Sequence, residues 1–164
     1  MKQYHFEGNT LVLKVKKSPI FVRAIMFFFS FVFFIAPISG IALSIVAGNR
    51  FHFGFLIGLL IFGLVGFYLL RISLWNAYGE EVIELNKPNV SYEANYGWFK
   101  DGKKSINYEL LSYSAKPIGY EEDKKGALII EGENTKIESV VKMPIIQIEE
   151  LIKILNNKSN QQRL

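Results

Sequence analysis

The hydrophobic positions near the N-terminus form two long uninterrupted runs. Residues 24–47 and residues 53–70 contain no charged side chain, and only the short loop 48–52 separates them. A helix needs about 20 apolar residues, with a range of roughly 17–25, to cross a hydrocarbon core. Because the loop is so short, the two helices must be antiparallel neighbours. The pattern therefore predicts a two-pass transmembrane hairpin.

The first run does not fit a cleaved signal peptide. Such a peptide has a shorter apolar region that begins closer to the N-terminus. Here about twenty residues, including a strand-like stretch, come first. We therefore expect the first helix to remain part of the protein.

Positive charges flank the predicted hairpin unevenly. Lys14, Lys16, Lys17 and Arg23 precede the first helix, whereas Arg50 is the only charged residue in the connecting loop. By the positive-inside rule, this asymmetry predicts that both termini face the cytoplasm. The residues expected to anchor the helix ends at the membrane interface are Arg23, Arg71, Trp75 and Tyr78.

Small residues recur at helical spacing in both runs. They are Ala36, Gly40, Ser44 and Gly48 in the first, and Gly54, Gly58, Gly63 and Gly66 in the second. Small residues let helix backbones approach closely in lipid, either within the hairpin or against another membrane protein. Pro37 is expected to bend the first helix, because proline removes a backbone hydrogen bond. No Asp, Glu or Lys lies inside either run, which disfavours a transporter and favours an anchor, scaffold or subunit.

Beyond residue 76 the pattern changes to the alternation of half-buried strands. Strands are expected at 82–85 and 90–96 with a turn at 87–89, and Asp101-Gly102 is a hairpin-turn signal before a strand at 105–110. Residues 111–115 either continue that strand or begin another. A charged loop at 121–126 precedes a hairpin formed by 127–131 and 136–141. Residues 8–17 also alternate and are expected to join this sheet.

A helix is expected to close the chain. Pro144 suits a first helical turn, and Ile145, Ile148, Ile152 and Leu155 recur at helical spacing on one face. The predicted organisation is an N-terminal cytoplasmic strand segment (1–18), the transmembrane hairpin (19–76), a β domain with a C-terminal helix (77–157) and a polar tail (158–164). The fold class is thus a membrane α-helical hairpin plus an α+β cytoplasmic domain. Its element order resembles a pleckstrin-homology-like curved antiparallel sheet with one C-terminal helix.

Two stretches resemble the photosystem I assembly factor family of cyanobacteria and chloroplasts. They are residues 74–87, LWNAYGEEVIELNK, with Trp75-Asn76 and Gly79 leaving the second helix, and residues 143–155, MPIIQIEELIKIL. The glycine spacing after Asn76 departs from the family pattern. The resemblance covers the layout of nearly the whole chain and implies a membrane-bound factor that assembles or holds a larger complex. Bacterial membrane proteins with pleckstrin-homology-like domains look like broader relatives.

Charge and composition restrict the function further. Half of the 164 residues are hydrophobic, and the mean hydropathy is +0.20. The chain carries a net charge of +4. Residues 1–75 carry a net charge of +6 and residues 76–164 a net charge of −2, so the basic character belongs to the membrane half. The predicted soluble part therefore lacks the basic surface of a nucleic-acid binder. The absence of cysteine excludes disulfides and thiol chemistry.

Candidate catalytic or ligand-binding residues are few. His5 and His52 lie on opposite sides of the predicted membrane and cannot share a metal ion. The acid pairs at 80–81, 121–122 and 149–150 are interpreted as solvated surface, and the tyrosines at 92, 96, 108, 113 and 120 as core or cross-strand residues. No phosphate-binding loop or nucleophile elbow is present. We predict no catalytic residue, no cofactor and no metal site.

The predicted hairpin tip around Asp101-Gly102 is the best candidate binding feature. It combines two aromatic and three basic residues, Trp98, Phe99, Lys100, Lys103 and Lys104. Such a tip could contact anionic lipid headgroups or a partner. The alternative is a solvated turn whose aromatic side chains pack in the core.

The favoured function is that of a non-enzymatic adaptor, accessory subunit or assembly factor of a larger membrane complex. Its partners would be membrane lipids and another integral membrane protein, without a nucleic acid or a small-molecule substrate. The alternative function is anionic-lipid binding through the basic tip. The Lys, Asn and Ile content suggests a low-GC bacterium, and hence the bacterial inner membrane as the location.

Overall fold

The computed structural model describes residues 2–108, 111–133 and 135–163. The chain forms two compact units. One, here called the hairpin unit, is Lys17–Tyr78. The other, here called the β unit, combines Met1–Lys16 with Gly79–Leu164, so the hairpin unit is an insertion within the sequence of the β unit.

Two long helices make up the hairpin unit. Helix α1 spans Ile20–Val46 and α2 spans Phe53–Tyr78, and both are long and apolar enough to cross a membrane. This confirms the predicted pair of helices. Helix α2 continues for eight residues beyond the apolar run, which ends at Leu70. Arg71 ends the run of uncharged residues but does not interrupt the helix. At 1.5 Å per residue, each helix is about 40 Å long.

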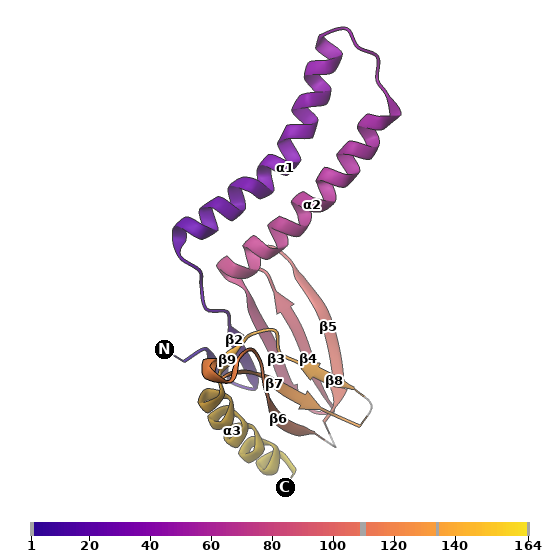
Figure 1. Ribbon diagram of the computed structural model, residues 1–164. Helices are drawn as coiled ribbons and strands as arrows, with labels where there is room; N and C mark the ends of the chain where they lie inside the picture. Colours follow the sequence, from indigo (N-terminus) through magenta and orange to yellow (C-terminus); the bar gives the residue numbers. More distant parts are fainter. Residues whose placement is uncertain (1, 109–110, 134, 164) are drawn as a thin grey trace. The chain divides into compact units, whose positions relative to one another are not determined.

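The first sheet of the β unit contains five antiparallel strands in sequence order. They are β1 (Tyr4–Glu7), β2 (Thr10–Lys14), β3 (Glu80–Asn86), β4 (Asn89–Asn95) and β5 (Lys100–Asn107) (Figure 1). Residues 8–17 were expected to join the sheet, and β2 does so by pairing with β3 from Thr10 opposite Glu84 to Lys14 opposite Glu80. The two strands that flank the membrane hairpin in the sequence are therefore direct neighbours in the sheet.

The second sheet is built around β7. It contains β6 (Ser112–Pro117), β7 (Lys125–Glu131), β8 (Lys136–Glu138) and β9 (Met143–Pro144), with a short 3₁₀ turn at Glu121–Asp123 before β7. Helix α3 (Ile145–Arg163) follows β9. The strands thus divide into two sheets, whereas the sequence pattern suggested one curved sheet. The close approach of the sheets is visible at Gly132, where an added Cβ would overlap the Ile106 side chain.

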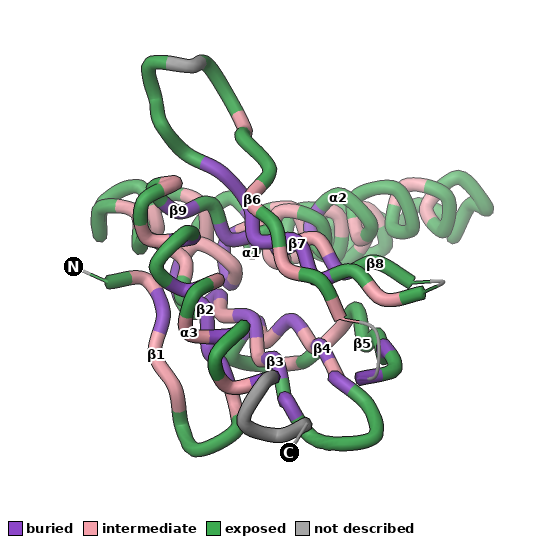
Figure 2. Tube along the Cα trace, turned by 90° about the horizontal axis from the view of Figure 1, so that it is seen from below, coloured by how far each residue is buried: buried purple, intermediate pink, exposed green. Residues whose placement is uncertain are grey.

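The core of the β unit lies between these layers (Figure 2). Strand alternation directs one face of each sheet inward, and α3 contributes the buried side chains of Ile148, Leu151 and Leu155. Other fully buried side chains are Leu11, Leu13, Ile83, Leu128, Ile130, Ile137 and Met143. Helix α3 does not end at the predicted polar tail. Lys158 instead donates to the Gly8 carbonyl at 3.0 Å and lies over the Phe6 ring.

The predicted turn at Asp101-Gly102 is wrong. Both residues lie inside β5, where Gly102 has φ +70° and the pairing with β4 shifts register between Tyr92 and Ala94. The turn between β4 and β5 is formed by residues 96–99 instead, closed by the Tyr96 amide donating to the Phe99 carbonyl at 2.9 Å. Gly97, with φ +87°, supplies the left-handed conformation that this turn needs.

Candidate functional site

Glu81 is the one charged side chain that the described part of the chain buries completely. It lies in β3 in phase with Ile83 and Leu85, on the strand face that points into the core. The prediction that the pair at 80–81 is solvated is therefore wrong for Glu81. Glu80 is partly exposed, because neighbouring residues of a strand point to opposite faces.

Three donors from two sheets surround the Glu81 carboxylate. The Tyr92 hydroxyl donates to Oε1 at 2.6 Å, and the Val140 amide donates to the same oxygen at 2.7 Å. The Val141 amide donates to Oε2 at 3.1 Å. Tyr92 belongs to β4 of the first sheet, whereas both valines lie in the segment between β8 and β9. Glu81 therefore joins the two sheets through hydrogen bonds.

The surroundings of Glu81 raise the pKa values of two side chains, those of Glu81 itself and of Tyr92. Burial raises the pKa of Glu81 above its ordinary value of 4.5, against the opposing effect of the hydrogen bonds from Tyr92, Val140 and Val141. Burial, reinforced by the adjacent Glu81 carboxylate, also raises the pKa of Tyr92, so its hydroxyl keeps the proton that it donates. Since Glu81 has no exposed surface and both of its oxygens accept bonds from the protein, this arrangement is a structural joint.

Ser139 fixes the segment that supplies the two valine amides. Its hydroxyl accepts from the Leu128 amide at 2.8 Å and donates to the Val141 carbonyl at 3.2 Å. The Ser139 amide donates to the Leu128 carbonyl at 2.9 Å. The sequence interpretation did not include this joint. The available signal was the position of Glu81 two residues before Ile83 and four before Leu85, in phase with an inward-facing strand.

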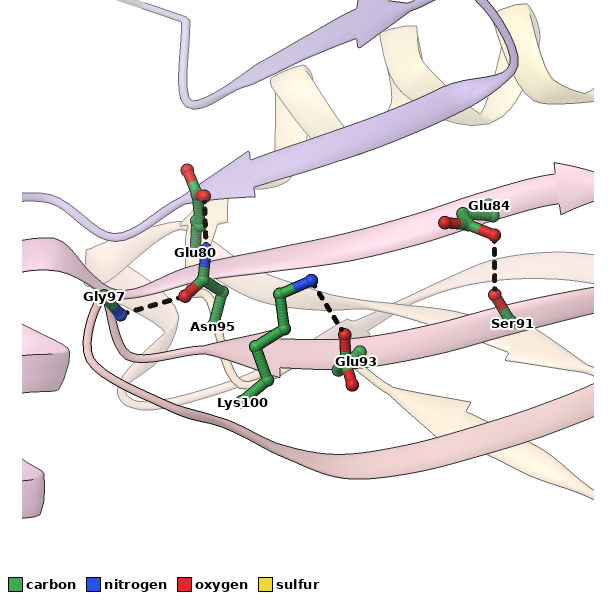
Figure 3. Close-up of polar contacts among 7 residues, drawn as sticks. All are labelled: Glu80, Glu84, Ser91, Glu93, Asn95, Gly97 and Lys100. Atoms are coloured by element: carbon green, nitrogen blue, oxygen red, sulfur yellow. Dashed lines mark hydrogen bonds and ion pairs between the residues drawn. The ribbon is translucent and has the colours of Figure 1, made fainter.

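The 96–99 turn is held by polar contacts at its base (Figure 3). The Asn95 side chain donates to Glu80 Oε1 at 2.9 Å, and its Oδ1 accepts from the Gly97 amide at 2.9 Å. Phe99 stacks on the Tyr96 ring with centroids 4.8 Å apart. Trp98 is 63% exposed. Only one of the two predicted aromatic residues therefore projects from the turn.

The three predicted lysines are distributed along β5 and do not gather at the turn. Lys100 pairs with Glu93 at 3.2 Å beside the turn (Figure 3). Lys103 and Lys104 lie further along the strand, and Lys104 is opposite Tyr92 in the register. The sequence interpretation grouped them because it placed the turn at 101–102, whereas the turn is formed by residues 96–99.

Close packing in the hairpin unit occurs around Gly66 and two serines. An added Cβ at Gly66 would lie 3.1 Å from the Phe34 ring. Ser30 and Ser73 are buried, and their hydroxyl oxygens are 3.2 Å apart across the two helices. Each hydroxyl also donates to a carbonyl four residues earlier in its own helix. These contacts satisfy the hydroxyl groups of the two buried serines.

Three of the predicted glycines line an apolar groove between α1 and α2. The residues of the groove are Pro37, Gly40, Ile41, Gly54, Phe55, Gly58, Leu59 and Phe62. Its volume is about 230 Å³. An added Cβ at Gly40, Gly54 or Gly58 would meet no other atom within 4 Å. These glycines therefore leave space that the chain itself does not fill.

The other predicted packing residues lie outside this groove. Gly63 has no neighbouring atom within 4 Å of an added Cβ, and Ala36 is exposed. Ser44 accepts from the Asn49 side chain at 3.3 Å, and Gly48 follows the end of α1 with φ +83°.

The predicted interfacial anchors all lie near helix ends. Arg23 is in the first turn of α1, and the anchors of α2 are Arg71, Trp75 and Tyr78 in its last turns. Tyr78 is 53% exposed.

Neither histidine takes part in a cluster of metal ligands. His5 lies 3.0 Å from Glu7, and His52 packs against the Phe55 ring. Among the residues that the structure describes, no group of three or more His, Cys, Asp or Glu side chains is arranged to hold a metal ion.

No protein-family model, curated protein or solved structure matches the chain.

Proposed function

We propose that this protein is a non-enzymatic, membrane-anchored adaptor, an accessory subunit or assembly factor that binds the transmembrane helices of a larger complex. The observation that carries the proposal is the apolar groove lined by Gly40, Gly54 and Gly58. Glycines that face open space let a partner's helix approach the backbone closely, which is how helices associate in lipid.

Other features support this function. The two buried serines of the hairpin unit, Ser30 and Ser73, are occupied by each other and by backbone carbonyls, and Glu81 is enclosed by protein donors. The residues that resemble the photosystem I assembly factor family, at 74–87 and 143–155, favour an assembly role, and the strands followed by α3 favour a pleckstrin-homology-like domain. We place the protein in a bacterial inner membrane with both termini in the cytoplasm.

A pull-down from the native membrane tests the proposal. Full-length protein, tagged at its C-terminus and solubilised in mild detergent, is expected to bring down a stoichiometric membrane partner. Gly58→Leu fills the groove, so we expect it to lose that partner. Gly63→Leu adds the same side chain outside the groove and serves as the matched control, which is expected to retain the partner.

Two results would overturn the proposal. One is a wild-type chain that always purifies alone or only with copies of itself. The other is a Gly58→Leu variant that retains its partner as fully as the Gly63→Leu control does.

A further inference from the structure

One serine of the hairpin unit has no hydrogen-bond partner for its hydroxyl within the described part of the chain. It is Ser39, in the second half of α1, and it is exposed. An exposed hydroxyl at this position of a membrane helix faces hydrocarbon, where there is no water to bind it. Ser39 therefore offers its hydroxyl to a neighbouring molecule. The other serines of the unit all form hydrogen bonds through their hydroxyls; they are Ser18, Ser30, Ser44 and Ser73.

Ser39 lies on the side of α1 that points away from the groove. Pro37 and Ile41, which line the groove, are two residues before and after it, and two residues correspond to about 200° of helical rotation. Ser30, which contacts α2, precedes Ser39 by about two and a half turns. A molecule bound at Ser39 therefore leaves the groove and the contacts with α2 unchanged.

An exposed row of residues, here called the outer stripe, runs along this side of α1. Its members recur at alternating intervals of four and three residues, which is the spacing of helices that pack side by side over several turns. None of them is charged, so two such stripes can meet without electrostatic repulsion. The outer stripe consists of Phe28, Val32, Ile35, Ser39, Ala42 and Val46, all of which are exposed.

The side chains around Ser39 are small. Ala36 precedes it by three residues and Ala42 follows it by three, and both alanines are exposed. Small side chains let a second helix approach α1 closely enough for a serine hydroxyl to reach across. The hairpin already contains such a contact, because the Ser30 and Ser73 hydroxyl oxygens are 3.2 Å apart across α1 and α2. The outer stripe therefore has the features of a second helix-packing face.

The occupant that this face fits is α1 of a second copy of the chain. Copies of a membrane protein insert in the same direction, so their α1 helices are parallel. A twofold axis along the membrane normal then places each residue of the stripe opposite its own counterpart. A hydroxyl both donates and accepts a hydrogen bond, so Ser39 satisfies a second Ser39. Every other layer of the stripe brings together identical apolar side chains.

We propose that two copies of this protein associate through the outer stripe of α1, with their Ser39 hydroxyls hydrogen-bonded to each other between parallel helices. The proposal rests on the hairpin unit crossing a membrane. It goes beyond the proposed binding of a partner in the groove, because the groove and the outer stripe lie on opposite sides of α1. Each dimer therefore presents two grooves to its partners.

Disulfide cross-linking of the full-length chain tests the face. The chain has no cysteine, so each single variant carries only the introduced thiol. In purified protein diluted into phosphatidylcholine liposomes, I35C, S39C and A42C are expected to form covalent dimers on mild oxidation. The matched controls I38C and I45C are exposed positions on another side of α1, and they are expected to remain monomeric. Equal cross-linking of the two sets, or no cross-linking in either, would overturn the proposal.

The hydroxyl is tested by the strength of the dimer. Energy transfer between copies labelled at the C-terminus, followed as the protein is diluted with lipid, gives the dissociation constant. Ser39→Ala is expected to weaken the dimer by about three- to tenfold, the range of one hydrogen bond between membrane helices. Ser44→Ala makes the same change two turns after Pro37, on the groove side of α1, and is expected to have no effect. Equal effects of the two variants would overturn the role of Ser39.

A groove variant separates this proposal from the proposed function. Gly58→Leu fills the groove, so it is expected to lose the partner of the larger complex and to keep the cross-link through S39C. If Gly58→Leu abolished that cross-link, the two copies would meet through the groove and the outer stripe would not be their interface. A chain that forms the S39C cross-link but never brings down a partner would overturn the proposed function and support the dimer.

Discussion

The hairpin unit and the β unit place their apolar side chains in opposite directions. Only 6% of the most apolar stretch of each membrane helix is buried within the protein, whereas strands β2, β3, β4 and β7 direct theirs into a shared core. In the hairpin unit exposure is the rule, as is expected of two helices that are long and apolar enough to cross a membrane. In the β unit exposure is the exception, and among its described residues the exposed large apolar side chains are those of Trp98, Tyr120, Val140 and Ile146.

The two units also satisfy their buried polar groups differently. Ser30 and Ser73 bind carbonyls one turn away and each other, so their partners lie within the hairpin. Glu81 depends on donors from Tyr92, Val140 and Val141, which are far apart in the sequence and in two sheets. Changes in the hairpin should therefore act locally, whereas a change at Glu81 should affect the whole β unit.

The largest effect is expected from Glu81→Ala. It leaves the Tyr92 hydroxyl and two valine amides without an acceptor, and unsatisfied buried donors cost about 1–3 kcal/mol each. We expect the free energy of unfolding to fall by roughly 3 kcal/mol or more, measured by chemical unfolding of the full chain in detergent. Hydrogen exchange at Val140 and Val141 should accelerate.

Glu80→Ala is the matched control for that experiment. It removes one partly exposed acceptor of the Asn95 side chain, so a loss of at most about 1 kcal/mol is expected. If the two alanine variants were equally stable, Glu81 would not join the sheets.

A smaller and local effect is expected in the hairpin unit. Gly66→Leu forces a side chain into the space of the Phe34 ring, and overpacking costs about 1–3 kcal/mol. Titration with SDS in mixed micelles, followed by the Trp75 fluorescence in a Trp98→Phe background, should show earlier separation of the helices. Gly63→Leu, which meets open space, should leave the titration unchanged; a matching shift in both variants would contradict the packing described for Gly66.

The smallest effect is expected from pH. The folded-state pKa of Glu81 lies above 4.5, so between these values the folded protein retains a proton that the unfolded chain releases. This contribution to stability is complete below pH 4.5 and is lost as the pH rises through the folded-state pKa. The unfolding free energy of the wild type minus that of Glu81→Gln should therefore decrease from acidic to neutral pH.

The exposed ion pairs do not disturb that comparison. Glu138 and Glu150 have lowered pKa values because Lys116 and Lys2 bind them, which gives the opposite slope with pH. Both pairs are present in the wild type and the variant, so they cancel in the difference. A difference that is constant with pH would contradict the raised pKa of Glu81.

The sequence was sufficient where one residue pattern has one structural solution. Two long apolar runs joined by five residues can hardly form anything except a helical hairpin, and the alternation around Val90 and Tyr92 predicted β4. The predicted hairpin ended at residue 76, two residues before the end of α2, although the apolar run itself stops at Leu70, because Arg71 and Asn76 interrupt the hydrophobic run without interrupting the helix.

The sequence was insufficient where a choice depended on distant partners. Asp101-Gly102 has the residues of a tight turn, but residues 96–99 form the turn, and the later pair lies within β5 next to the register shift between Tyr92 and Ala94. Glu81 could not be identified as a buried joint, because its donors at 140 and 141 lie about sixty residues away. The groove at Gly58 likewise depends on the register of two helices, which the spacing of small residues does not determine.

The pairing of β2 with β3 makes completion of the first sheet dependent on the return of the chain after the hairpin unit. During synthesis, β1 and β2 emerge first and must wait for 65 further residues, 15–79, before their partner strand exists. Closing a flexible loop of that length would cost about 3–4 kcal/mol in chain entropy. A helical hairpin brings its two ends close together and removes much of that cost. A chain whose second helix failed to fold back along the first would leave the edge of β2 unpaired, so a complete first sheet indicates that the hairpin has formed.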